Sequence, residues 1–222
     1  MENQDLTPCL VAGASGLVGR ALVRRILADE AGPGAVALVR RPMGAGRPRL
    51  AEVVVDFGKL EGVEVPRAGT AFCALGTTMA KAGSEAAFRA VDLDAVVAFA
   101  RLARRAGVSR FLLVSAAGAD PGSSIFYSRV KGEAEEAVKA VGFDGVALFR
   151  PSLLLGERAE SRPAERVAIV ASGLVSWAMA GPLARWKPVP AESVAAAMLA
   201  VAAGALEGVR IVENDEIHRL AS

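Results

Sequence analysis

A glycine-rich turn near the start of the chain constrains the fold more than any other feature. Residues 9–12 form a short apolar run, three glycines follow at a spacing of three, and a helical pattern begins at Leu17. A Gly-Pro-Gly sequence ends that pattern, and residues 35–39 supply a second apolar run. Residues 9–39 therefore have the size and order of one βαβ unit. Such a unit predicts a parallel sheet with a phosphate-binding turn.

The rest of the chain repeats the alternation of apolar runs and helical patterns. Further strands are expected at 52–56, 70–75, 110–115, 146–149 and 209–212, and further helices at 86–106 and 124–141. This order is typical of the α/β class and predicts a Rossmann-like, doubly wound parallel sheet. We expect a single domain over residues 1–222. Residues 1–150 would form the cofactor-binding core and residues 151–222 a small C-terminal lobe that faces the substrate.

Composition supports this class and excludes others. Hydrophobic residues make up 53% of the chain and aromatic residues 5%, which suits parallel strands buried on both faces. The 26 basic residues are scattered and nearly balanced by 24 acidic ones, so neither nucleic acid nor a membrane is an expected partner. Cys9 and Cys73 fall in apolar runs and are expected in the core. The single histidine, His218, argues against a His-based metal site or triad.

No targeting or membrane segment is expected. Residues 1–5 are polar and acidic, unlike a secretory signal peptide. The apolar stretch 167–184 is interrupted by glycine, proline and serine, and the stretch 193–205 is short. We therefore expect a cytoplasmic protein.

The glycine turn itself predicts a dinucleotide site, because backbone N–H groups at a helix N-terminus can meet a pyrophosphate. The expected contacts are Gly13, Ser15, Gly16, Leu17, Val18 and Gly19. Beyond the turn, Arg40 and Arg41 stand where a cofactor without a 2′-phosphate usually finds an acidic residue. Two guanidinium groups can hold a phosphate, so we expect NADP rather than NAD. The alternative is a solvated arginine pair on a loop.

Two further strand ends could contact the cofactor. Asp56 and Phe57 could meet the adenine, or could equally be a strand-ending acid and a core aromatic. Gly76 follows the expected strand 70–75 and permits a close backbone approach at the carboxyl edge of the sheet.

Tyr127 and Lys131 lie four residues apart in an expected helix, which places both on one face. A cation beside a phenol favours proton transfer near neutrality. Tyr127 is the only tyrosine of the chain, and Ser115 ends the preceding strand. The three residues resemble the Ser, Tyr-x-x-x-Lys set of short-chain dehydrogenases/reductases. The resemblance implies that Ser115 orients a carbonyl, Tyr127 transfers a proton and Lys131 binds the ribose; otherwise Ser115 is a turn hydroxyl.

Longer motifs narrow the resemblance. They are Gly13-Ala-Ser-Gly-Leu-Val-Gly19, Leu38-Val-Arg-Arg-Pro42, Cys73-Ala-Leu-Gly-Thr-Thr78, Phe126-Tyr-Ser-Arg-Val-Lys-Gly-Glu133 and Arg150-Pro-Ser-Leu-Leu-Leu155. Together they resemble the atypical short-chain dehydrogenases related to the Tat-interacting protein, the CC3-like NAD(P)-binding oxidoreductases. The family implies NADPH contacts at Ser15 to Val18, Arg40, Arg41, Leu75, Gly76, Tyr127, Lys131, Leu154 and Arg162. Asp92 stands where many short-chain dehydrogenases carry an asparagine, so an Asn-supported proton relay is not expected.

Two functions remain open on the sequence. One is an NADPH-dependent oxidoreductase, monomeric or homodimeric, that acts on a small carbonyl or alcohol. Trp177, Met179 and Trp186 would then be candidates for its pocket walls, although such apolar residues are more often core or helix contacts. The other is a redox-sensing or scaffold protein that binds NADPH without significant turnover. Ser115, Tyr127 and Lys131 together favour the enzyme, because sensing needs no proton donor.

Overall fold

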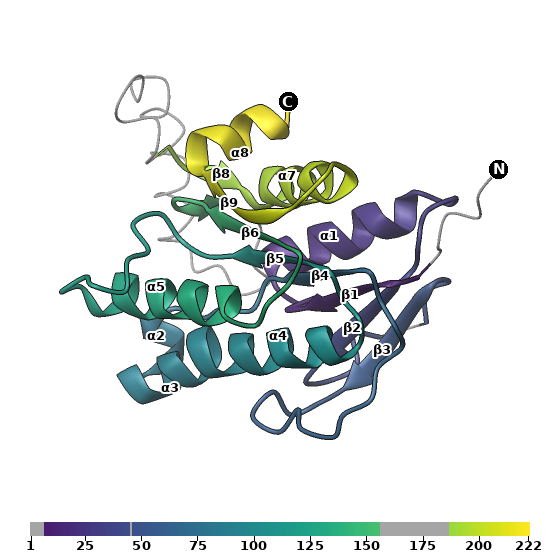
Figure 1. Cartoon of the computed structure of the whole chain (residues 1–222), viewed down its shortest axis with the longest axis horizontal. Helices are drawn as coiled ribbons and strands as arrows, with labels where there is room; N and C mark the ends of the chain where they lie inside the picture. Colours follow the sequence, from purple (N-terminus) through teal and green to yellow (C-terminus); the bar gives the residue numbers. More distant parts are fainter. Residues whose placement is uncertain (1–6, 45, 156–186) are drawn as a thin grey trace.

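The computed structural model describes residues 7–44, 46–155 and 187–222, which form a layered α/β structure (Figure 1). Its main sheet has seven parallel strands in the order β3-β2-β1-β4-β5-β6-β9. The strands are β1 (Cys9–Ala12), β2 (Ala35–Val39), β3 (Leu50–Val54), β4 (Thr70–Cys73), β5 (Arg110–Val114), β6 (Gly145–Arg150) and β9 (Gly208–Glu213). The chain winds one way from β1 to β3 and the other way from β4 onward. This confirms the doubly wound, Rossmann-like sheet predicted from the sequence.

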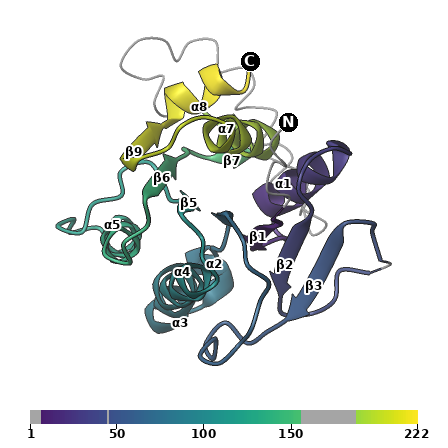
Figure 2. The same ribbon diagram turned by 45° about the vertical axis from the view of Figure 1, so that its right-hand side comes forward.

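Helices cover both faces of the sheet. On one face lie α1 (Leu17–Ala28), α7 (Ala191–Ala203) and α8 (Asn214–Leu220), with α1 packed against α7 (Figures 1 and 2). On the other face lie α4 (Ala95–Arg105) and α5 (Phe126–Lys139). The short helices α2 (Met79–Ala82) and α3 (Glu85–Arg89) and the π-helix η1 (Ala90–Asp94) precede α4. None of the helices in the described ranges is long and apolar enough to cross a membrane.

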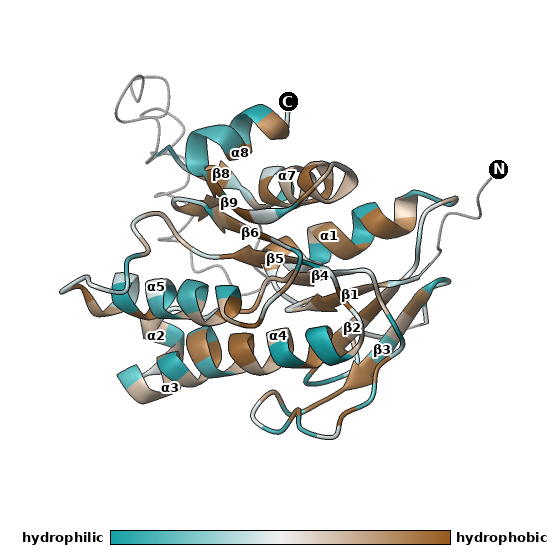
Figure 3. Cartoon of the chain, viewed as in Figure 1, coloured by the Kyte–Doolittle hydropathy of each residue, from teal (hydrophilic) through white to brown (hydrophobic). Residues whose placement is uncertain are grey.

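Strand residues point alternately to the two helical layers, which splits the core in two. Along β1, Val11 packs on the α1 and α7 side, whereas Leu10 packs on the α4 side. Figure 3 shows the result as apolar strands and helices with one apolar face. Cys9 and Cys73 are free and buried, as expected.

The structure differs from the sequence-based elements in two places, whereas the expected strand 209–212 is present as β9. The third strand lies at Leu50–Val54 rather than 52–56, because pairing with β2 and not the run of valines sets its register. The predicted helix 86–106 is interrupted by η1, which is a one-turn widening of the helix. Residues 187–222 supply β9, α7 and α8, so they complete the main sheet and its helical layer. A small parallel pair, β7 (Leu154–Leu155) and β8 (Val189–Pro190), lies beside them.

Candidate active site

The glycine turn between β1 and α1 is shaped by close backbone contacts. Gly13 has a φ of +82°, and a Cβ on it would lie 2.3 Å from the carbonyl oxygen of Ala74. A Cβ on Gly19 would lie 2.1 Å from the carbonyl oxygen of Gly13. Gly16 is exposed, and the nearest atom to its Cβ position is 3.2 Å away. Gly13 and Gly19 therefore allow the turn to fold, and Gly16 leaves its outer side open to a ligand.

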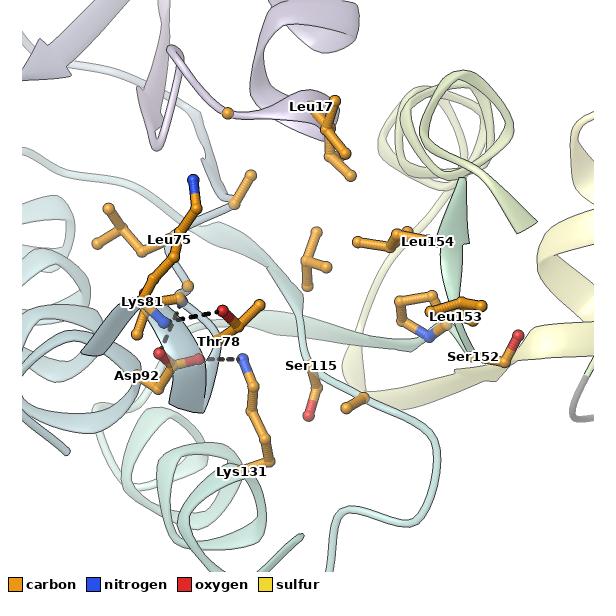
Figure 4. Close-up of a pocket in the computed structure, with 18 of the residues that line it drawn as sticks. Leu17, Leu75, Thr78, Lys81, Asp92, Ser115, Lys131, Ser152, Leu153 and Leu154 are labelled. Atoms are coloured by element: carbon orange, nitrogen blue, oxygen red, sulfur yellow. Dashed lines mark hydrogen bonds and ion pairs between the residues drawn. The ribbon is translucent and has the colours of Figure 1, made fainter. Parts of the chain in front are cut away.

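A cleft of about 740 Å³ opens at the carboxyl edge of the sheet beside this turn (Figure 4). This volume lies within the usual range for small-molecule and cofactor sites. Ten of the residues predicted for the site line it: Ser15, Gly16, Leu17, Val18, Leu75, Gly76, Ser115, Tyr127, Lys131 and Leu154. The glycine turn and the Ser, Tyr and Lys residues thus face one cavity, although they come from distant parts of the chain.

The other predicted site residues lie outside the lining of this cleft. Arg40 and Arg41 are exposed directly after β2, next to the β1 strand end, and neither has an ion-pair partner within the described ranges. Asp56 is exposed after β3, and its Oδ1 accepts a hydrogen bond of 2.9 Å from the Gly58 N–H. Phe57 is buried in the core, so the core alternative holds for this residue. Arg162, Trp177, Met179 and Trp186 fall outside the described residues.

Helix α5 positions Tyr127 and Lys131 at the cleft. Tyr127 lies in its first turn, is 37% exposed and packs against the Phe88 ring at a centroid distance of 5.5 Å. Lys131 follows one turn later on the same face and is buried. The helix approaches the loop before it closely at Gly132, where a Cβ would lie 2.2 Å from the nitrogen of Pro121. The predicted face-sharing of Tyr127 and Lys131 is therefore present.

Lys131 forms an ion pair with Asp92, which is almost fully buried. The distance from Lys131 Nζ to Asp92 Oδ1 is 2.7 Å. Burial lowers the pKa of Lys131, but the Asp92 carboxylate and, to a smaller extent, Tyr127 and Cys73 raise it, and the net shift is upward. Lys131 therefore remains an ammonium group despite its burial. The sequence placed Asp92 in the asparagine position but did not reveal this direct contact with the lysine.

Ser115 follows β5 and adds a hydroxyl to the same side of the cleft as Lys131 (Figure 4). Its backbone N–H donates a hydrogen bond of 2.7 Å to the Phe149 carbonyl, which fixes the strand end. Its Oγ is buried and has no hydrogen-bond partner among the described residues. A buried hydroxyl without a partner is costly, so this atom is suited to meet a polar ligand atom.

A second buried ion pair holds α5 against the sheet. Glu135, one turn beyond Lys131, receives two hydrogen bonds from Arg150 at the end of β6, of 3.0 and 2.6 Å. Buried Asn214 accepts from the Ser152 N–H at 2.9 Å and donates to the Lys187 carbonyl at 2.8 Å. The first contact fixes the helix that carries Tyr127, and the second fixes the loop after β6 that lines the cleft.

Two basic residues in the cleft were missed by sequence reasoning. Arg20 lies in α1 directly after the glycine turn, and Lys81 reaches into the cleft from α2 (Figure 4). The position of Arg20 could have predicted its role, because a cation in the first turn of the helix after the glycine turn lies close to a phosphate bound at that helix N-terminus. Lys81 belongs to the run Lys81-Ala-Gly83, which also resembles the family, but this run alone assigned Lys81 no contact with the cofactor.

Comparison with known proteins supports a nicotinamide cofactor. The model of the NAD(P)H-binding family matches residues 13–204. The chain belongs to this family. Protein HTATIP2 of Rattus norvegicus is 39% identical over 173 residues, which cover 76% of this chain and 70% of that protein. This chain is thus also similar to a protein of the Tat-interacting group, which its sequence motifs resemble.

A fungal relative and a solved structure complete the comparison. The protein fmp52-1, mitochondrial, of Aspergillus terreus is 34% identical, with 88% of this chain and 87% of that protein covered. The structure of MoeE5 in complex with UDP-glucose and NAD has a TM-score of 0.65 at 18% identity and covers 96% of this chain and 80% of that one. The likeness to MoeE5 concerns the fold.

The expectation of a cytoplasmic protein is wrong by this comparison, because the fungal relatives are named mitochondrial. The error has a physical reason. A polar N-terminus argues only against a secretory signal, and the composition of a folded domain carries no information about its compartment.

Proposed function

We propose that this NAD(P)H-binding protein is an NADPH-dependent oxidoreductase that transfers a hydride to or from a small carbonyl or alcohol substrate. The observation that carries the proposal is the Ser115 hydroxyl, buried and without a partner in the described structure, in one cleft with Tyr127 and Lys131. A substrate oxygen placed there could receive a hydrogen bond from Ser115 and exchange a proton with Tyr127.

The residues present fit a dinucleotide. The open side of Gly16 and the N–H groups at the start of α1 can approach a pyrophosphate, and Arg20 adds a positive charge in the cleft. Lys131 would hold the ribose hydroxyls, and Leu75, Gly76 and Leu154 would line the remainder of the cofactor site. When bound, the cofactor supplies or accepts the hydride.

The preference for NADPH rests on Arg40 and Arg41. Both are exposed beside the β1 strand end, and no described acid pairs with them. Paired guanidinium groups favour a phosphate over a hydroxyl. Asp56 stays in the proposal as a contact for the adenine, through the carboxylate oxygen that Gly58 does not use.

In the proposed reaction, Tyr127 donates a proton to a carbonyl oxygen during reduction, or removes one from an alcohol during oxidation. Ser115 orients that oxygen, and the ammonium of Lys131 stabilises negative charge on the Tyr127 side of the cleft. The half-exposed Tyr127 lies where the cleft meets solvent, so its proton can be exchanged after each turnover.

The test is a screen of NADPH oxidation with aldehydes, ketones and quinones, run on wild type, Tyr127→Phe and Ser128→Ala. Ser128→Ala removes a hydroxyl from the neighbouring position of α5 and serves as the control. Tyr127→Phe should lose about 100-fold or more in kcat, with a much smaller loss of NADPH affinity, because the ring stays in place and only the hydroxyl is removed. Turnover that survives in Tyr127→Phe would reject this proton donor. Tight NADPH binding without any turnover would favour the sensor or scaffold function.

A further inference from the structure

Asp92 is the most deeply buried acid in contact with the cleft. It is 1% exposed and lies in η1, where the helix widens for one turn between α3 and α4. Such π-helical turns often occur at functional sites, because they turn a side chain that a regular helix would direct elsewhere. Here η1 packs against α5, which carries Lys131.

The two carboxylate oxygens of Asp92 contact two different parts of the cleft. Oδ1 lies 2.7 Å from Lys131 Nζ (Figure 4). Oδ2 accepts a hydrogen bond of 2.8 Å from the Thr77 N–H. Thr77 follows Gly76 in the turn after β4, and both residues line the cleft. A Cβ on Gly76 would lie 3.3 Å from Asp92 Oδ1 and 3.7 Å from Lys131 Nζ. The absence of a side chain at Gly76 therefore leaves room for the ion pair.

The surroundings of Lys131 make this carboxylate necessary. The other titratable groups that act on the ammonium are Tyr127 on its own helix and Cys73 at the end of β4. Burial raises the pKa of the Cys73 thiol to about 12, so this group is neutral at physiological pH. Glu135 is engaged by Arg150. Asp92 is thus the permanent negative charge that Lys131 contacts in the described structure, and a lysine buried without one tends to lose its proton.

We propose that Asp92 is a positioning residue of the site: it keeps Lys131 charged in its buried position and ties that ammonium to the Gly76–Thr77 turn. One side chain then fixes the position of the turn after β4, which would face the cofactor, relative to helix α5, which carries Tyr127 and Lys131. The part of this inference that concerns turnover rests on the proposed function, whereas the part that concerns cofactor binding rests on the family alone.

Asp92→Asn tests the charge with little change of shape. The amide oxygen can still accept from the Thr77 N–H, but Lys131 loses its counter-charge. Asp94→Asn is the matched control, because Asp94 lies in the same turn and is exposed. The dissociation constant of NADPH, followed by the fluorescence of the bound nicotinamide from pH 6 to 10.5, reports on Lys131 without requiring turnover.

We expect the alkaline loss of NADPH affinity to move at least about one pH unit towards acid in Asp92→Asn. At pH 9 this variant should bind NADPH about tenfold more weakly than wild type, and at pH 6.5 within about threefold. Asp94→Asn should follow wild type throughout. If Asp92→Asn keeps the wild-type pH profile, Asp92 does not act through the charge of Lys131, and the inference is overturned.

Two arrangements keep the test decisive. If Asp92→Asn does not fold, the double variant Asp92→Asn/Lys131→Met removes the stranded cation and should regain a cooperative unfolding transition. A double variant that is no more stable than Asp92→Asn would overturn the inference. If wild type binds NADPH but reduces nothing, the proposed oxidoreductase function fails, while the pH profile of binding still decides the role of Asp92.

Discussion

The two halves of the proposed site are built by different means. The nucleotide half consists of the glycine turn between β1 and α1, which lines the cleft, and of the ends of β2 and β3 beyond the cleft lining; it presents backbone groups, glycines and exposed arginines. The reaction half, made of β4, β5, β6, η1 and α5, presents side chains that are held by two buried ion pairs. The shape of the nucleotide half depends on glycines, because a side chain at Gly13 or Gly19 would collide with the backbone. The shape of the reaction half depends on ion pairs between residues that are distant in sequence and come together only in the folded chain.

This difference predicts how each half responds to substitution. In the nucleotide half, the effect of a glycine-to-alanine substitution depends on which way the added methyl group points. At Gly13 the methyl group collides with the backbone and destabilises the fold, whereas at Gly16 it points to the side on which we expect the ligand.

In the reaction half, the loss of Asp92 leaves Lys131 buried without its counter-charge. The loss of Glu135 leaves Arg150 with its longer contact of 3.3 Å to Glu213. Both losses are costly for stability. The variants below separate these responses.

The largest effect is expected for Gly13→Ala. The positive φ of Gly13 and the 2.3 Å approach of its Cβ position to Ala74 should together cost about 3 kcal/mol or more in the free energy of unfolding. Gly16→Ala is the matched variant: it should fold normally but bind NADPH at least about tenfold more weakly. Urea denaturation and NADPH titration measure the two quantities. A Gly16→Ala protein with unchanged affinity would show that phosphate does not approach this turn.

Glu135→Gln should produce the next largest loss of stability. Glu135 is 1% exposed and binds Arg150 through both oxygens, so its neutralisation should cost about 3 kcal/mol. The neighbouring Glu136 pairs with Lys139 at the surface, and Glu136→Gln should cost less than about 0.5 kcal/mol. Urea denaturation of both variants at pH 7 gives the comparison. Equal losses would mean that the buried pair contributes no more than the surface pair.

Arg40→Ala tests the cofactor preference of the nucleotide half. We expect NADPH affinity to fall about 10- to 100-fold, which corresponds to one or two hydrogen bonds between charged groups, and NADH affinity to change less than about twofold. Arg47→Ala, an exposed arginine of the same loop, is the control. Isothermal titration with each cofactor measures the difference. Equal losses for NADPH and NADH would contradict an NADP-specific role.

The nucleotide half could be predicted from the sequence because its signals are local. The glycine spacing and the first two apolar runs lie within one βαβ unit, the Arg40-Arg41 pair follows it directly, and the structure places the turn as the spacing predicts. The strands could be located because each is a continuous apolar run. The register of β3 at the sheet edge could not, since three consecutive valines fit several alignments.

The reaction half was only partly predictable. The spacing of Tyr127 and Lys131 is local, so their common helical face followed from the sequence. The contacts of Lys131 with Asp92 and of Glu135 with Arg150 join separate elements, and no periodicity encodes them. The widened turn η1 could not be predicted either, because the residues of a single π-helical turn are of the same types as those of the α-helix around it. Tertiary packing decides all three.

The smallest expected effect separates the turn-forming and ligand-binding roles of Asp56. Asp56→Asn keeps an oxygen that can accept from the Gly58 N–H, so the free energy of unfolding should not change measurably. If the second carboxylate oxygen binds the adenine amino group, NADPH affinity should fall about threefold, as for one exposed hydrogen bond. Adenosine 2′,5′-bisphosphate, which lacks the nicotinamide, should lose affinity by the same factor. An unchanged affinity for both ligands would assign Asp56 to the turn alone and limit the nucleotide half to β1, α1 and β2.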